Sequence, residues 1–242
     1  MKPVHKKPWM PSKNAWNSPN NQQVSTLDTE RMSGRYSIGE EIAHVLSHGL
    51  GLLLSVGGLA VLVAYSSLYG DAWHIVSTSI YGTTLILLYS ASTLYHGIPH
   101  TKAKQLLRRF DHAAIFLLIA GTYTPFTLVN LRGGWGWTLF GILWGLAVAG
   151  IVFKLFFIGR WPRLSTALYV IMGWLVVIAI PPMLRTLDTA TLIWLLAGGL
   201  SYTGGVYFYA KDHKPYFHAI WHGFVLLGGL CHWFAVYTGT LP

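Results

Sequence analysis

Residues 217–237 read FHAIWHGFVLLGGLCHWFAVY, a stretch without Asp, Glu, Lys or Arg. An α-helix rises about 1.5 Å per residue, so a stretch of about 20 residues crosses the hydrocarbon layer of a lipid bilayer. His218 and His222 lie four residues apart, on one face of such a helix. The stretch therefore predicts a membrane-spanning helix that carries a polar pair near one end.

The whole chain has a similar composition. Its 242 residues are 53% hydrophobic and only 10% charged, whereas a soluble domain carries about 25% charged residues because its surface faces water. Lipid must therefore surround much of the chain. The single cysteine, Cys231, excludes an intramolecular disulfide or a multi-cysteine metal site, so any metal must bind to histidines and carboxylates.

Apolar stretches of similar length divide most of the chain, and we expect an all-α bundle of seven transmembrane helices. The expected spans are residues 42–65, 73–95, 112–130, 135–157, 164–184, 190–210 and 217–237. Residues 1–41 are polar, and they lack an apolar run long enough for a signal peptide. We expect these residues to form a disordered tail or to lie on the membrane surface, and residues 42–242 to form the membrane domain.

Basic residues in the connections predict the orientation. Fifteen of the 17 Lys and Arg lie on the side of the N-terminus, and only Arg132 and Arg185 lie on the other side. Lys and Arg are retained on the cytoplasmic side, so we expect a cytoplasmic N-terminus and an external C-terminus. The net charge of +9 is then a signal of topology, and nucleic acid is not an expected partner.

Polar side chains at membrane depth gather near one end of the spans. Burying such groups without partners is costly, so each needs a structural or functional reason. All lie at span ends that face the cytoplasm in the predicted topology. They are His44, His48, Ser92, His96, Asp111, His112, His218 and His222. The sequence thus predicts one polar layer built from several helices.

The spacing of His218 and His222 lets two imidazoles share one metal ion. A third histidine from another helix, with water in the fourth position, would complete the open site typical of catalytic zinc. We choose His96 as the third ligand, although spacing alone does not separate it from His44 and His48. Histidines at helix ends also commonly bind carbonyls or headgroups, which is the alternative without a metal.

Asp111 and Ser92 could take part in chemistry at this metal. Asp111 would hold or deprotonate a metal-bound water, and Ser92 would donate a hydrogen bond to that water or to a substrate oxygen. Both have structural alternatives. Asp111 follows Arg108 and Arg109, which would suit an ion pair or an N-cap of span three. Ser92 alone is typical of a hydroxyl that packs helices together.

With these motifs in order along residues 37–237, the chain resembles the hemolysin III family, the prokaryotic branch of the progestin and adipoQ receptor superfamily. The motifs are Glu41, His44 and His48; Ser92 and His96; RRFDH at residues 108–112; IAGTYTPF at residues 119–126; and His218 with His222.

This resemblance implies seven helices, a cytoplasmic N-terminus and a zinc ion near the cytoplasmic face. It also implies a multi-pass protein of a bacterial plasma (inner) membrane. Its three histidine ligands map onto His96, His218 and His222, its water-holding carboxylate onto Asp111, and its serine onto Ser92. One position departs from the family pattern, because His44 stands where the family commonly has Asn. His44 could therefore add a ligand or change the hydrogen bonds, and the role of His48 stays open.

Three functions compete. The first is an intramembrane zinc-dependent hydrolase of a lipid amide, suggested by the likeness of the superfamily to alkaline ceramidases, with a membrane lipid or fatty-acyl ligand between the helices. The second is a non-enzymatic sensor or regulator of membrane state with structural zinc, in which His44, His48 or Asp111 supplies a fourth ligand. Either of these two would act in membrane lipid homeostasis. The third function, a pore or transporter, is weaker, because a conducting path needs polar groups through the whole membrane and here they stop near the cytoplasmic face.

Overall fold

The computed structural model describes residues 36–158 and 160–241, so most of the predicted tail lies outside the described residues. Within the described chain all regular structure is helical. The α-helices are α2 (Ile38–Tyr69), α3 (Ala72–Gly97), α4 (Thr101–Pro125), α5 (Gly134–Phe157), α6 (Pro162–Gly173), α7 (Ile180–Thr186), α8 (Thr189–Ala210) and α9 (Phe217–Thr240). A π-helical turn, η2 (Phe126–Asn130), follows α4, and a 3₁₀ turn, η3 (Leu175–Ala179), separates α6 from α7.

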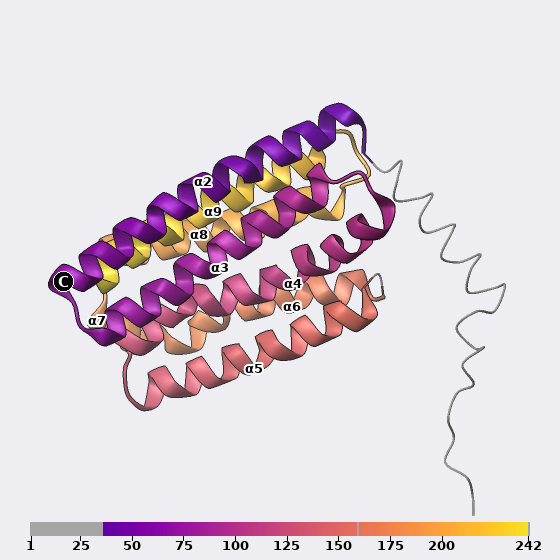
Figure 1. Ribbon diagram of the computed structural model, residues 1–242. Helices are drawn as coiled ribbons and strands as arrows, with labels where there is room; N and C mark the ends of the chain where they lie inside the picture. Colours follow the sequence, from indigo (N-terminus) through magenta and orange to yellow (C-terminus); the bar gives the residue numbers. More distant parts are fainter. Residues whose placement is uncertain (1–35, 159, 242) are drawn as a thin grey trace, which may run out of the picture. The chain divides into compact units, whose positions relative to one another are not determined.

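The helices of the unit that begins at Ile38 pack side by side (Figure 1). Helix α2 packs against α3, α3 against α4, and α4 against α5. Helix α9 packs against both α8 and α2, which brings the last helix next to the first. Short connections join helices that run in opposite directions, so the starts of α2, α4 and α9 meet the end of α3. This arrangement places the polar layer at one end of the bundle.

Six helical segments among the described residues are long and apolar enough to cross a membrane: Ile38–Tyr69, Ala72–Gly97, Thr101–Asn130, Gly134–Phe157, Pro162–Thr186 and Phe217–Thr240. Their outer faces carry large exposed apolar side chains, for example Leu53, Leu68 and Phe156. Such faces suit lipid as the surrounding solvent. The predicted integral-membrane helical bundle is confirmed at this level.

Helix α8 is also present where a span was predicted, and it has 22 residues. It does not belong to the six segments above, because Gly, Thr, Ser and Tyr dilute its apolar residues. The count of seven spans therefore remains a prediction, as do the sides of the membrane on which the two termini lie.

Span three differs from its predicted start. Helix α4 begins at Thr101 and includes the basic segment that we expected to be a connection, so Asp111 lies well inside the helix. The side chain of His100 caps this helix by accepting a hydrogen bond from the backbone N–H of Ala103. The alternative that Asp111 is the N-cap of span three is therefore wrong. A hydropathy pattern misses this extension because polar residues can continue a helix beyond the lipid.

Span five is interrupted. Helix α6 ends at Gly173, and the chain passes through Trp174 and η3 before α7 begins. Tyr123 of α4 satisfies backbone groups at this break: its hydroxyl lies 2.6 Å from the carbonyl oxygen of Gly173 and accepts a hydrogen bond from the backbone N–H of Val176 at 2.9 Å. Because lipid offers no hydrogen bonds, a broken helix needs such a partner within the protein.

Candidate metal centre and adjoining cavity

Five histidines meet at one end of the bundle, and we call them the His cluster: His44 and His48 of α2, His96 of α3, and His218 and His222 of α9. All five side chains are buried. They come from parts of the chain nearly 180 residues apart, and the contacts of α2 with α3 and α9 bring them together. The predicted convergence of these histidines is present in the structure.

Three of these residues have the arrangement of a metal-ligand set. One possible ligand atom from each of His96, His218 and His222 lies within 4.8 Å of the other two. Glu41, His44 and His96 form a second group that meets the same condition. Imidazole nitrogens and carboxylate oxygens are ligands of divalent metals such as zinc. The chemistry of the donor set therefore fits a metal ion.

The other two histidines crowd this triad. The ring centre of His44 lies 4.4 Å from that of His96, 4.9 Å from that of His218 and 5.1 Å from that of His222. The ring of His48 stacks on that of His222, with centres 3.6 Å apart and planes 7° apart. Both additional candidates thus belong to the cluster.

Helix α2 also orients the ring of His96. The carboxylate of Glu41 accepts a hydrogen bond from Nδ1 of His96 at 2.7 Å, and its second oxygen accepts one from Nζ of Lys104 at 2.6 Å. Because a carboxylate only accepts, the imidazole hydrogen must lie on Nδ1, and Nε2 keeps its lone pair for a ligand bond. A carboxylate that holds a histidine in this way is common behind metal ligands.

Ser47 orients the ring of His222 in a similar way. Its hydroxyl donates to the carbonyl oxygen of His44 at 2.9 Å and lies 3.1 Å from Nδ1 of His222. Since the hydroxyl has one hydrogen, Nδ1 of His222 is the donor in the second contact, which again leaves Nε2 as the free lone pair. Glu41 and Ser47 thus favour the same tautomer in two histidines of the triad.

Sequence reasoning gave no role to Glu41, Ser47 or Lys104. For Glu41 a signal was present, because Glu41, His44 and His48 are spaced three and four residues apart and share one helical face. Ser47 and Lys104 carried no comparable signal. Their roles depend on which faces of α2, α3, α4 and α9 meet.

Asp111 and Ser92 lie close to the His cluster without joining the ligand groups above. Oδ2 of Asp111 lies 3.4 Å from Nδ1 of His112, and the charge of Asp111 acts on both His48 and His96. Ser92 is buried one helical turn from His96, and its hydroxyl has no hydrogen-bond partner among the described residues. Buried hydroxyls normally have a partner, so Ser92 could bind a ligand.

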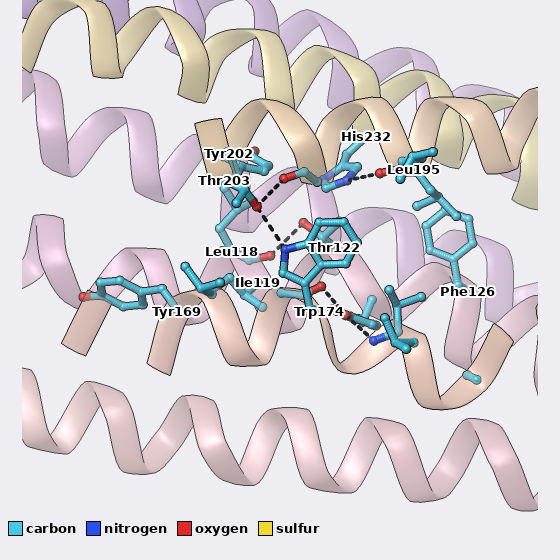
Figure 2. Close-up of a pocket in the computed structure, with 18 of the residues that line it drawn as sticks. Leu118, Ile119, Thr122, Phe126, Tyr169, Trp174, Leu195, Tyr202, Thr203 and His232 are labelled. Carbon is cyan, nitrogen blue, oxygen red and sulfur yellow. Dashed lines mark hydrogen bonds between the residues drawn. The ribbon is translucent and has the colours of Figure 1, made fainter. Parts of the chain in front are cut away.

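A cavity of about 300 Å³ lies beside this cluster, between α4, η2, the segment from α6 to α7, α8 and α9. Figure 2 shows part of its lining, including Leu118, Phe126 and Leu195. The lining is mainly apolar, and Trp174 closes one wall by donating from Nε1 to the Thr203 hydroxyl at 3.0 Å. Its size is at the lower end of the range for ligand pockets.

One end of the cavity lies next to the His cluster. Tyr169 and Tyr209 line this end. The hydroxyl of Tyr169 donates to the carbonyl oxygen of His112 at 2.9 Å, and the ring centre of Tyr209 lies 6.4 Å from that of His218. The cavity therefore approaches the polar layer from the middle of the bundle.

The cavity also extends to the outer surface of the bundle. Several lining residues are about half exposed, namely Val177 of η3, Ile180 and Leu184 of α7, and Leu196 of α8. Gly51 and Gly58 of α2 lie against neighbouring side chains and leave no comparable space. Gly51 faces Tyr89 and Leu226, for example. The broken segment of span five lines one side of this space.

The fold and the cluster define a multi-pass helical membrane protein with a buried group of side chains that can hold a metal ion. A family model described as "Haemolysin-III related" matches residues 36–233, and the chain belongs to this family. The resemblance drawn from the motifs is confirmed.

Two bacterial relatives are close. The "Hemolysin-3 homolog" of Bacillus subtilis (strain 168) is 48% identical over 201 residues, which cover 83% of this chain and 94% of the relative. "Hemolysin-3" of Bacillus cereus is 46% identical over 215 residues, covering 88% and 98%. The "Monocyte to macrophage differentiation factor" of Homo sapiens is 26% identical over 213 residues, covering 85% and 87%, and is a distant relative of the progestin and adipoQ receptor type. The protein is a multi-pass membrane protein, and the plasma membrane is its expected location.

Proposed function

We propose that this protein is a zinc-dependent hydrolase of the acyl bond of a membrane lipid, with a lipid amide as the first candidate substrate. The observation that carries the proposal is that the His96, His218 and His222 donor set lies near an apolar cavity, because the ring centre of the lining residue Tyr209 is 6.4 Å from that of His218. Hydrolysis of such a lipid needs a polar reaction centre next to a space for a hydrocarbon chain. Through this reaction the protein would act in membrane lipid homeostasis.

The proposal includes seven spans. Helix α8 packs along α9 and would be about 33 Å long at 1.5 Å per residue, which is enough to cross the hydrocarbon layer. Its buried residues Gly198, Ser201 and Gly205 lie on the packed side, and membrane helices favour small residues where they pack together. An odd number of spans also fits the basic residues, which favour a cytoplasmic N-terminus and an external C-terminus. The His cluster then lies near the cytoplasmic face.

In the proposed site, Nε2 atoms of His96 and His222, together with His218, hold the zinc ion. Zinc supplies Lewis acidity and makes water a nucleophile at neutral pH. Glu41 and Ser47 keep the rings of His96 and His222 oriented for this task. The remaining steps depend on residues from α3 and α4.

Asp111 would accept the proton that water loses when it attacks the acyl carbonyl, and would pass it to the amide nitrogen as the C–N bond breaks, which releases a fatty acid and an amine. The carboxylate lies near the cluster and belongs to neither of the two ligand groups, which suits a base better than a ligand. The hydroxyl of Ser92, which has no partner among the described residues, would donate a hydrogen bond to the acyl oxygen as negative charge develops there. The hydrocarbon chain of the substrate would occupy the cavity and enter between η3, α7 and α8.

A second function is favoured by His44. Its ring lies about as close to the rings of the triad as these rings lie to one another. If His44 completes a four-histidine set, the site has no open position, and zinc is structural. The protein would then be a regulator that responds to the state of the membrane without hydrolysing lipid.

The variant Asp111→Asn separates these functions. In the hydrolase, Asp111→Asn retains zinc and loses hydrolysis of ceramides and related lipid amides, because the amide keeps the shape of the side chain and cannot act as the base. Asp188→Asn, a carboxylate at a helix start away from the cluster, is the control. Zinc-loaded wild-type protein that hydrolyses none of these lipids would overturn the hydrolase and favour the regulator. Loss of zinc from Asp111→Asn would make Asp111 a ligand.

A further inference from the structure

A second polar region lies where α4, α5 and α6 meet, outside the His cluster. It contains five cationic residues, which we call the basic cluster: Arg108 and Arg109 of α4, Lys154 of α5, and Arg160 and Arg163 at the start of α6. The three helices pack against one another. Arg109 also connects two of them directly, because its Nη1 donates to the carbonyl oxygen of Leu155 at 3.1 Å.

Lys154 is the unusual member, because it lies inside a membrane-spanning helix and only 4% of its surface is exposed. Its Nζ lies 5.8 Å from the centre of the Tyr169 ring. Its cationic neighbour Arg108 acts on it unfavourably. A buried cation is costly unless an anion compensates for it.

The described part of the chain supplies no such anion. None of the ion pairs formed by the described residues includes Arg109, Lys154, Arg160 or Arg163. Glu41 of α2 is engaged elsewhere, since it pairs with Lys104, and Asp111 of α4 lies against His112. An anion from outside the described part of the chain would therefore complete this region.

Membrane topology alone does not explain why Lys154 is buried between helices. The retention of positive charge on one side of a membrane accounts for basic residues in connections, such as Arg160 and Arg163. It does not require a lysine whose side chain packs between helices. A lysine that only extends its ammonium group into water would also leave more of its side chain exposed.

The surroundings indicate the kind of anion. Exposed aromatic side chains lie beside the basic cluster, namely Phe110, Phe156, Phe157 and Trp161. Such residues are typical of the headgroup level of a membrane. The outer face of α5 continues from there with exposed Val148 and Val152, which suit hydrocarbon chains. Basic pockets between helices at this depth bind anionic lipid headgroups.

We propose that the basic cluster binds the phosphate of an anionic phospholipid, such as phosphatidylglycerol, with Lys154 as its buried contact. Arg109 and Arg163 provide guanidinium groups that suit phosphate oxygens. The acyl chains lie against the exposed apolar face of α5. This site is separate from the proposed reaction centre and does not depend on hydrolysis.

Thermal unfolding of the purified protein in a neutral detergent tests the proposal. Phosphatidylglycerol raises the melting temperature in a concentration-dependent way, whereas phosphatidylcholine with the same chains does not. Lys154→Met, which keeps an unbranched side chain and removes the charge, weakens the apparent affinity about fivefold. Lys214→Met, an exposed lysine near the start of α9, leaves it unchanged.

Three outcomes would overturn the proposal. They are equal stabilisation by phosphatidylcholine, unchanged phosphatidylglycerol affinity in Lys154→Met, and equal stabilisation by inorganic phosphate, which would assign the site to a free anion. If Lys154→Met does not fold, Lys154→Arg and the double variant Arg109→Gln, Arg163→Gln replace it. The first must retain the affinity for phosphatidylglycerol, and the second must weaken it.

Discussion

The His cluster and the cavity are neighbours that are built in opposite ways. The cluster joins α2, α3 and α9, which are continuous helices, and its side chains contact one another and are held by Glu41 and Ser47. The cavity lies against the interrupted segment from α6 to α7, and its lining is mainly apolar. The bundle thus keeps polar groups where helices are regular and leaves space where a helix is broken.

This difference implies a division of roles in the proposed hydrolase. Buried polar groups are costly unless their hydrogen bonds are satisfied, so they belong where several helices can provide partners. Space for a hydrocarbon chain needs few partners but requires helices that do not pack along their whole length. Variants that affect one region should therefore leave the other unchanged.

The largest effect is expected from Glu41→Ala. Loss of the carboxylate frees Nδ1 of His96 and removes the partner of Lys104, so zinc affinity should fall about 10- to 100-fold. Competition with a coloured chelator measures this change. The matched control is Glu40→Ala, because Glu40 precedes Glu41 and instead accepts a hydrogen bond from the backbone N–H of Tyr216. If Glu41→Ala bound zinc as tightly as Glu40→Ala does, Glu41 would not orient His96 for the metal.

A smaller change is expected from filling the cavity. Val206→Trp adds an indole to a lining position of α8 and should lower the affinity for a fluorescent fatty-acyl probe about tenfold, with zinc content unchanged. Leu200→Trp makes a comparable change on the exposed face of the same helix and should leave binding unchanged. If Val206→Trp lost both its zinc and its affinity for the probe, the His cluster and the cavity would not be separate regions.

The break in span five gives a third, still smaller effect. Tyr123→Phe removes the hydroxyl that bonds to backbone groups at Gly173 and Val176, and should lower the free energy of unfolding by about 1–3 kcal/mol. Thermal unfolding measures this loss. Tyr69→Phe, at an exposed position of α2, is the control. If both variants melt at the same temperature, Tyr123 does not stabilise the break.

The smallest effect concerns Asp188, which caps α8 far from the cluster. Hydrogen bonding with the side chain and backbone of Thr191 lowers the pKa of Asp188 below its usual value. A carboxylate whose folded pKa is lowered stabilises the fold above its unfolded pKa, and this contribution is lost as the pH falls through the folded pKa. Asp188→Ala should therefore lower the melting temperature slightly at neutral pH and hardly at all in acid. A constant difference across this range would contradict the capping role.

The sequence predicted the helices well, because apolar length is a direct consequence of crossing lipid. It missed the start of α4 at Thr101, since the polar residues before Asp111 continue the helix beyond the apolar stretch. It also missed the break after Gly173. That break is stabilised by Tyr123 from another helix, and no local pattern reports such a partner.

The His cluster was also predictable in outline. The positions of the histidines at span ends placed them in one layer, because antiparallel helices return to the same side of the membrane. The orienting roles of Glu41 and Ser47 required the structure. They depend on the rotation of α2 toward α3 and α9, which hydropathy does not determine.

The metal content of the purified protein tests the central claim most directly. Elemental analysis should find about one zinc per chain in the wild type, and much less in His96→Ala and in the double variant His218→Ala, His222→Ala. His74→Ala, which changes a histidine at the start of α3 away from the cluster, should retain the zinc. A wild-type protein without metal after zinc has been supplied, or histidine variants that retain it, would contradict the proposed metal centre.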